Sequence, residues 1–375
     1  MFVARAVVFA AGVLVVIGTL GSALRTVVLP RGVPSQLART VFILVRKAFR
    51  LRAGRHSSYE RRDRVMALYG PSALFALLAV WVLAVIVGYE GMYWGIAGGS
   101  IRTAFLQSGS SIFTLGIVRP TGLGGEALAF SEAALGLVLL ALLITYLPSL
   151  YGAFSRREAA VTALEVRAGA PPSGVEMIER YFRLERPDKL NEVWTRWEDW
   201  FVELEETHTS FGALTFFRSP QPDHSWVTAA GAVLDGASLL VSSIDVPHDV
   251  QADICIRAGY LALRRITDFF RIPYHHDPHF PDHPISVRRD EFEAALDRLA
   301  LAGAPIKPDR DQAWQDFAGW RVNYDDVLLS LAGLTIAPPA PWSSDRSLQD
   351  WSPPLIRRVA KLRGLAIPGH TFERA

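Results

Sequence analysis

The stretch Ser108–Val118, SGSSIFTLGIV, gathers groups that could bind a cation. Its hydroxyls belong to Ser108, Ser110, Ser111 and Thr114, and Gly116 follows two positions later. Residues 98–118 contain a single charge, Arg102. The segment is too short and hydroxyl-rich for a spanning helix and too apolar for a solvated loop. We therefore expect a half-membrane helix with an irregular return, because non-helical backbone at membrane depth is tolerated only in protein or along a water-filled path.

A second cluster lies at residues 275–283, HHDPHFPDH. Imidazole and carboxylate groups are zinc-type ligands, so His275, His276, His279 and His283 are candidate metal ligands. No helical spacing holds them together, and the prolines favour an exposed polar loop. The sequence favours that loop over a metal site.

Three apolar runs must position these groups: Ala6–Leu24, Met66–Tyr89 and Ala133–Ser155. Each is close to or above the ~20 residues that a helix needs to cross a bilayer. We expect three transmembrane helices. The first run could instead be a cleaved signal peptide, because Arg5 precedes it and small residues follow it.

Charge is divided unevenly along the chain. Residues 1–155 carry 14 Lys and Arg against 5 Asp and Glu, whereas residues 156–375 carry 25 against 32. The linker Arg25–Arg64 alone holds 11 cations and 2 acids, and Gln36–Arg55 has the pattern of an amphipathic helix on an anionic lipid surface. The cations of this linker do not have the every-third spacing of a voltage-sensor helix. The positive-inside rule predicts that this linker and residues 158–375 are cytoplasmic.

Composition excludes other classes. The single cysteine, Cys255, rules out an internal disulfide framework and a multi-cysteine zinc site. Nucleotide, metalloprotease and hydrolase signatures are missing. Most of the basic surplus lies between apolar runs, so we expect no nucleic-acid partner. Arg outnumbers Lys 35 to 4, which is typical of a GC-rich bacterial genome and predicts a bacterial plasma membrane location.

Outer helix, short helix, Thr-x-Gly turn and inner helix in this order resemble the pore domain of the potassium channel family. In that family a Thr-x-Gly-Tyr-Gly run turns backbone carbonyls toward the axis. The resemblance implies a selectivity filter at Thr114, Leu115, Gly116, Ile117 and Val118, with Ser108, Ser110 and Ser111 on the pore helix. Gly136 and Pro148 correspond to hinge and kink positions of the inner helix, although each alone also fits ordinary packing or a helix end.

The filter departs from the family's pattern. Ile117 stands where the family has an aromatic residue, Val118 where it has the second glycine, and Arg119 where it has an acid. A β-branched residue at a glycine position costs ~1–3 kcal/mol, and a cation at the mouth repels a permeant cation. These residues leave the ion selectivity open.

The rest of the chain is predicted to be an all-α cytoplasmic domain of five or six helices. Expected helices cover 188–206, 226–241, 250–270, 290–302 and 309–332, with an extension of the inner helix over 158–168 and a strand candidate at 213–217. Leu190, Val193, Trp194, Trp197, Phe201 and Leu204 are expected to form one buried face. The boundaries are 1–24, 25–65, 66–155, 156–337 and a Pro-rich basic tail, 338–375, with Arg357, Arg358, Lys361 and Arg363.

The sequence as a whole predicts an all-α membrane protein with three spanning helices, a re-entrant pore loop and a helical cytoplasmic domain. The expected function is passive conduction of a monovalent cation through a homotetramer, without enzymatic activity or a cofactor, and with lipids and the permeant ion as partners. A membrane-anchored scaffold or sensor, and a membrane-anchored metal-dependent enzyme using residues 275–283, remain as alternatives.

Overall fold

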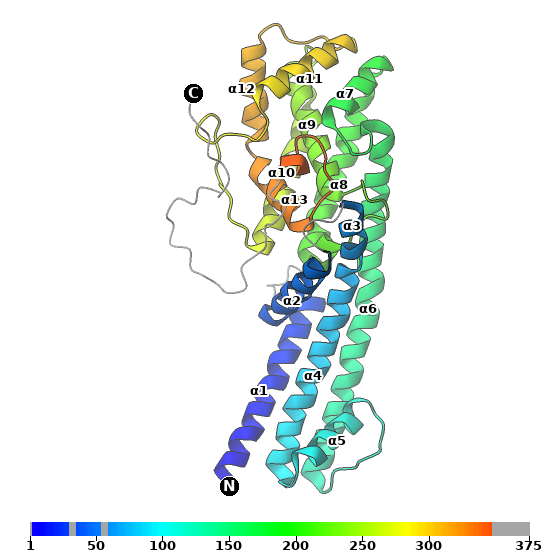
Figure 1. The fold of residues 1–375 in the computed structure, drawn as a ribbon, viewed down its shortest axis with the longest axis vertical. Helices are drawn as coiled ribbons and strands as arrows, with labels where there is room; N and C mark the ends of the chain where they lie inside the picture. Colours follow the sequence, from blue (N-terminus) through cyan, green and yellow to red (C-terminus); the bar gives the residue numbers. More distant parts are fainter. Residues whose placement is uncertain (1, 30–34, 54–58, 347–375) are drawn as a thin grey trace.

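The chain forms a rod in which a bundle of long helices carries a larger helical domain at one end (Figure 1). The computed structural model describes residues 2–29, 35–53 and 59–346. All regular elements in these residues are helices, and one isolated bridge joins Ile244 to Ile306. The expectation of an all-α protein is therefore confirmed for the described chain.

The bundle consists of α1 (Phe2–Val27), α4 (Tyr69–Ala97) and the lower part of α6 (Leu123–Ala168), which lie side by side. Each is long and apolar enough to cross a membrane. Helices α1 and α6 extend beyond the predicted apolar runs at both ends, whereas α4 starts later than predicted, at Tyr69, and continues past Tyr89 to Ala97. A fourth helix, α9 (Trp226–Ser243), meets the same criterion of length and composition. Protein buries 94% of its apolar window against 11% for α6, so α9 has the surroundings of a core helix.

Glycines let α1 and α4 pack closely. A Cβ added to Gly12 would lie 2.3 Å from the carbonyl oxygen of Gly88, and one added to Gly95 would lie 2.8 Å from the Cβ of Phe9. Gly91 and Gly95 form a GxxxG pair, a spacing that lets membrane helices approach at backbone distance. Arg5 donates from Nε to the carbonyl oxygen of Gly95 (3.1 Å) at the end of α4. These contacts make α1 an integral part of the bundle.

A short helix, α5 (Ile101–Ile112), follows α4 and packs between α4 and α6 at the far end of the bundle (Figure 1). Residues 113–122 then lead irregularly into α6. Ser100 caps α5 by accepting a hydrogen bond from the Thr103 backbone N–H. A short helix followed by an irregular segment is thus present in the fold, and its re-entry into a membrane stays a prediction.

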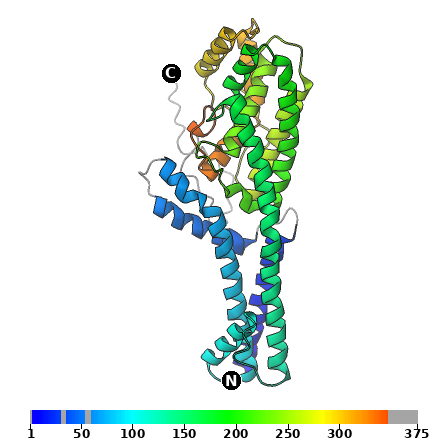
Figure 2. The same ribbon diagram turned by 90° about the vertical axis from the view of Figure 1, so that its right-hand side faces the viewer.

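Helix α6 connects the bundle to the helical domain without interruption (Figure 2). It runs for 46 residues, includes Pro148 and continues through 158–168 as predicted, ending at Gly169 with a positive φ of 78°. The bundle and the domain therefore share one continuous helix.

The basic linker forms α2 (Gln36–Ala53) and α3 (Tyr59–Ala67) at the junction between bundle and domain. The predicted amphipathic helix is confirmed in position, but α2 faces protein on one side: Arg46 donates to the carbonyl oxygen of Leu334 (2.6 Å). From the domain, Arg218 binds Asp63 of α3 (2.5 Å) and the carbonyl oxygen of Thr335 (2.7 Å).

A second junction contact is made inside α6. Arg157 donates to the carbonyl oxygens of Leu214 (3.0 Å) and Phe217 (2.7 Å), and its Nη1 lies 3.2 Å from His208 Nε2. Because a guanidinium only donates, Nε2 accepts, and Nδ1 is left to donate to the carbonyl oxygen of Leu204 (2.9 Å). His208 is therefore neutral in this arrangement.

The domain contains α7 (Gly174–Arg183), η1 (Pro187–Lys189), α8 (Leu190–Ser210), η2 (Gly212–Phe216), α10 (Val250–Phe270), α11 (Arg289–Leu301), α12 (Arg310–Arg321), α13 (Asp325–Thr335) and η3 (Ser344–Arg346) around α9. The predicted face of α8 is buried at all six positions. Ser225 caps α9, and Gly303 has a positive φ of 88° after α11. These helices confirm most of the predicted elements, while α7 was not predicted.

Two predictions are wrong. Residues 309–332 form two helices instead of one, because the Asn323 side chain donates to the carbonyl oxygen of Gly319 (2.9 Å) and so ends α12. Asp325 and Asp326 then favour a new helix N-terminus. Residues 213–216 belong to the 3-10 helix η2 instead of a strand. The Arg157 guanidinium donates hydrogen bonds to the carbonyl oxygens of Leu214 and Phe217, which are therefore not available to a strand partner.

Buried charges tie α9, α12 and α13 together. Arg321 is fully buried and forms ion pairs with Asp235 and with Asp325 (2.7 Å). Burial opposes its charge, but the two carboxylates outweigh that effect and raise the pKa of Arg321. The predicted basic patch of the tail, at 357–363, lies outside the described residues.

Candidate functional site

Helix α5 ends well inside the length of the two long helices that flank it. The Ser108 hydroxyl lies 3.2 Å from the carbonyl oxygen of Ile86, eleven residues before α4 ends. The carbonyl oxygen of Ile112 lies against Gly136, thirteen residues after α6 begins. At 1.5 Å per residue these positions are about 16 and 20 Å from the nearer helix ends. The C-terminus of α5 is therefore well inside the length of the bundle.

The segment 113–118 is fastened to the end of α5 by its backbone. Thr114 N–H donates to the carbonyl oxygen of Ser111 (3.0 Å), and Leu115 N–H to that of Ser110 (2.8 Å). Val118 N–H donates to Ser110 Oγ (3.1 Å). Ser110, predicted as a pore-helix residue, thus holds both the start and the end of the predicted filter.

Backbone handedness alternates in this segment. Thr114 has a φ of 54° and Gly116 a φ of 66°, whereas the residues between and after them keep negative φ. Thr114 follows the C-cap Phe113, and the N–H groups of Thr114 and Leu115 make the hydrogen bonds of a Schellman motif to the carbonyl oxygens of Ser111 and Ser110. The positive φ of Thr114 therefore ends α5. Because the N–H groups of Thr114, Leu115 and Val118 are donated to α5, the backbone carbonyl oxygens are the groups of this segment that a cation would use.

A buried carboxylate supports α5 from α6. Glu132 is fully buried, and its Oε1 accepts a hydrogen bond from the Ser108 hydroxyl (2.5 Å). Its other oxygen has no hydrogen-bond partner among the described residues. An ionisable group inside an apolar span is a candidate functional residue by default, because burying it is costly. Sequence reasoning missed Glu132, although an acid directly before the run 133–155 was a usable signal.

Hydroxyl groups extend this polar cluster across the bundle. The Tyr93 hydroxyl lies 3.2 Å from Ser111 Oγ, and the Tyr89 hydroxyl donates to Ser131 Oγ (2.9 Å). All three predicted pore-helix serines are buried, and each has a defined partner. The serines thus fix α5 to its neighbours and to the segment that follows.

Gly136 and Pro148 take different roles in α6. A Cβ at Gly136 would lie 2.4 Å from the carbonyl oxygen of Ile112, so this glycine makes room for the end of α5. Pro148 lies within the helix near the junction, and α6 continues through it. The close approach at Gly136 gives a packing reason for the residue, and the predicted hinge remains a prediction.

Three large apolar side chains next to the predicted filter are exposed in the single chain. Phe113, Leu115 and Ile117 are 57%, 58% and 75% exposed. Exposed apolar groups of this size mark a surface that contacts lipid or another protein.

The histidine loop does not form a metal site in the described chain. The rings of His275 and His283 lie 4.4 Å apart, but His275, His276 and His279 are exposed. No group of three His, Cys, Asp or Glu side chains with metal-binding geometry occurs among the described residues. The exposure of these histidines agrees with a polar loop, and the metal-dependent enzyme stays an untested alternative.

No protein-family model, no curated protein and no solved structure matches this chain.

Proposed function

We propose that this protein conducts monovalent cations passively through a pore made by four copies of the segment between α4 and α6. In this proposal α1, α4 and α6 span the membrane, α5 enters it halfway and residues 113–122 return to the same side. The arrangement is that of the potassium-channel-like pore loop that the sequence resembles.

One observation carries the proposal: α5 ends about 20 Å from the start of α6, against Gly136, and is followed by a segment in which Thr114 and Gly116 have positive φ. The depth of about 16–20 Å derived above is close to half of a ~30 Å hydrocarbon layer.

The chemistry follows from these groups. The C-terminus of a helix bears partial negative charge, so the end of α5 at Ile112 favours a cation near residues 113–116. Carbonyls of Thr114–Val118 and the Thr114 hydroxyl would replace the ion's water shell. Arg119 at the mouth weakens cation entry, and the aromatic and second glycine of the family's filter are replaced by Ile117 and Val118. We therefore assign monovalent cations as the substrate class without strict potassium selectivity.

The basic linker sets the orientation. By the positive-inside rule, α2, α3 and the helical domain face the cytoplasm of a bacterial plasma membrane. The domain then acts as a regulatory or assembly unit, since α6 joins it directly to the pore-forming helix.

Cation flux from liposomes containing the full chain tests the proposal. Gly116→Ala places an alanine in a left-handed backbone conformation, which costs ~1–2 kcal/mol of conformational free energy. It causes no steric clash, because nothing lies within 4 Å of the added Cβ. We expect at least a tenfold loss of flux for Gly116→Ala and for Thr114→Ala.

Gly122→Ala is the matched control, since Gly122 also has positive φ (80°) and open space but lies outside the predicted filter. It should keep its flux within about twofold. Wild-type liposomes without flux would contradict conduction and leave the membrane-anchored scaffold or sensor as the interpretation. Stoichiometric zinc binding lost on His275 and His276 substitution would instead support the enzyme alternative.

A further inference from the structure

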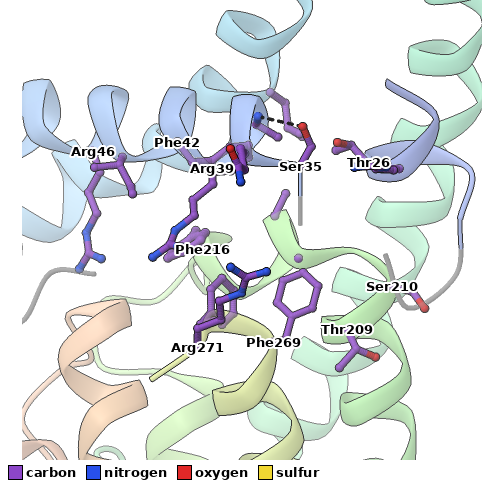
Figure 3. Close-up of a pocket in the computed structure, with 18 of the residues that line it drawn as sticks. Thr26, Ser35, Arg39, Phe42, Arg46, Thr209, Ser210, Phe216, Phe269 and Arg271 are labelled. Carbon is purple, nitrogen blue, oxygen red and sulfur yellow. Dashed lines mark hydrogen bonds between the residues drawn. The ribbon is translucent and has the colours of Figure 1, made fainter. Parts of the chain in front are cut away.

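A cavity of about 130 Å³ lies at the junction between the bundle and the helical domain (Figure 3). Its walls come from the end of α1, from α2, from the middle of α6 at Tyr146 and from the domain at η2 and the end of α10. These elements lie far apart in the sequence, so only the folded junction creates the cavity. It does not overlap the residues of the proposed pore.

The cavity carries a strong positive charge. Four arginines line it, Arg25, Arg39, Arg46 and Arg271, whereas no Asp or Glu is among its lining residues in the described chain. The side chains of Arg39 and Arg271 point toward one another from α2 and from the end of α10 (Figure 3). Burial, and then the charge of Arg271, lower the pKa of Arg39. An anion between the two guanidinium groups would remove this repulsion.

Arg46, at the edge of the cavity on the side of α13, is a further buried guanidinium that is incompletely paired. Its side chain is 4% exposed, and only Nη2 has a partner, the carbonyl oxygen of Leu334. Nε and Nη1 have no hydrogen-bond partner among the described residues. Burial lowers the pKa of Arg46 to about 10, and Arg50 and Arg218 add to this effect. A buried guanidinium with two unmade hydrogen bonds is costly unless an anion satisfies it.

The remaining walls are apolar. Aromatic rings of Phe42, Phe216 and Phe269 lie beside the arginines, and Leu74 and Tyr146 extend the lining along α4 and α6. A free inorganic anion would leave this surface without a function. A molecule with an anionic head and a hydrocarbon tail would use both parts of the lining.

We propose that the junction cavity binds the head group of one anionic phospholipid per chain, with its phosphate at Arg39 of α2 and Arg271 of α10 and its apolar end toward Leu74 and Tyr146. The position fits, because the cavity lies where the apolar helices α1 and α4 meet the basic linker, which is the level of lipid head groups. The proposal rests on the membrane location of these helices and does not require conduction.

Binding would link the bundle to the domain. Arg39 and Arg46 belong to α2, whereas Arg271 ends α10, so a phosphate contacting both sides stabilises the observed junction. Arg271 adopts a left-handed conformation (φ 57°) that usually favours glycine or asparagine. The chain therefore keeps an arginine where its backbone conformation is unfavourable.

Native mass spectrometry and thermal unfolding of the delipidated full chain in detergent test the proposal. We add phosphatidylglycerol, phosphatidylcholine with the same acyl chains, or inorganic phosphate. We expect one phosphatidylglycerol per chain, bound at least tenfold more tightly than phosphatidylcholine, and an unfolding temperature that phosphate alone does not raise. Arg39→Gln and Arg271→Gln should each weaken phosphatidylglycerol binding at least fivefold.

Lys47→Gln is the matched control, because Lys47 is exposed on the same helix and does not line the cavity. It removes the same charge and should change binding less than twofold. Equal weakening by Lys47→Gln would show a diffuse attraction of α2 to lipid and overturn the site. Equal binding of both lipids would also overturn it, and stabilisation by phosphate alone would assign a small-anion site instead. Since no flux is measured, a failure here leaves the conduction proposal unaffected.

Discussion

At the scale of single residues, the chain places ionisable side chains in two kinds of buried setting. Arg321 is compensated by two carboxylates, whereas Glu132 has one hydroxyl donor and one oxygen without a partner in the described chain. Compensated charges of the first kind hold a fold together. An incompletely paired carboxylate beside the predicted pore helix points to a role in positioning α5.

Glu132→Gln and Glu132→Ala separate positioning from charge. Glutamine keeps an oxygen that can accept the hydrogen bond of the Ser108 hydroxyl. Alanine removes that acceptor and leaves a cavity beside the buried hydroxyl. We expect Glu132→Ala to lower the free energy of unfolding by about 1–3 kcal/mol and to reduce liposome flux severalfold, with Glu132→Gln close to wild type in both. Loss of flux in Glu132→Gln at unchanged stability would show that the charge itself is required.

His208 predicts a pH dependence of stability. Burial, and then the charge of Arg157, hold the pKa of His208 well below 6.5. The unfolded chain therefore binds one more proton below its own pKa of ~6.5, and stability present above that pH is lost as the pH falls toward the folded-state value. Replacing it by glutamine, which can still accept from Arg157, should reduce the loss between pH 7 and 5.5 by about 1 kcal/mol.

Chemical denaturation of the full chain in detergent at both pH values measures this difference. His279→Gln is the control, because the His279 side chain is 68% exposed. It should leave the pH dependence unchanged. An identical slope for wild type and His208→Gln would mean that His208 titrates normally in the folded protein.

At the scale of elements, the position of α5 depends on glycine at its point of contact with α6. A Cβ at Gly136 would meet the Ile112 carbonyl at 2.4 Å, a distance that forces the end of α5 to move. The residues after Ile112 would move with it, because Ser110 and Ser111 hold the following segment. The predicted filter therefore depends on a contact made by a different helix.

Gly136→Ala should destabilise the protein by about 1–3 kcal/mol and reduce flux more than tenfold, since overpacking a close contact displaces the helix. Thermal unfolding and liposome flux measure the two effects. Gly152→Ala on the same helix is the control, because its nearest neighbour is the flexible end of Arg156 at 3.6 Å. Comparable effects of both variants would assign the change to α6 itself instead of to the contact with α5.

At the scale of the whole molecule, orientation and depth decide whether the bundle acts as a pore. The domain and the proposed pore lie at opposite ends of the rod, joined by α6. If the domain is cytoplasmic, the residues after the proposed filter open to the outside, and the two ends differ in their access to reagents that do not cross membranes.

Single introduced cysteines test this topology in intact cells, because the native Cys255 is fully buried. A membrane-impermeant maleimide should label Arg119→Cys rapidly and Arg257→Cys only after permeabilisation, since both positions are exposed but lie at opposite ends. Labelling at Ser108→Cys should be at least tenfold slower than at Arg119→Cys. Equally fast labelling at positions 108 and 119 would place α5 in a solvated loop and remove the basis of the pore.

The sequence by itself determined the three apolar helices, the short helix before an irregular segment and most helices of the domain. These features follow from local patterns of hydropathy, capping and turn residues, which each segment carries within itself. Two predictions failed because side chains bind backbone carbonyl groups. The Asn323 amide binds the carbonyl oxygen of Gly319, where a longer helix was predicted. Arg157, which is distant in sequence, binds carbonyl oxygens of the segment 213–217, where a strand was predicted. Only the tertiary structure brought Glu132 to Ser108, Gly136 to Ile112 and four arginines to one cavity. Contacts between segments so far apart depend on how helices pack, and no local pattern encodes them.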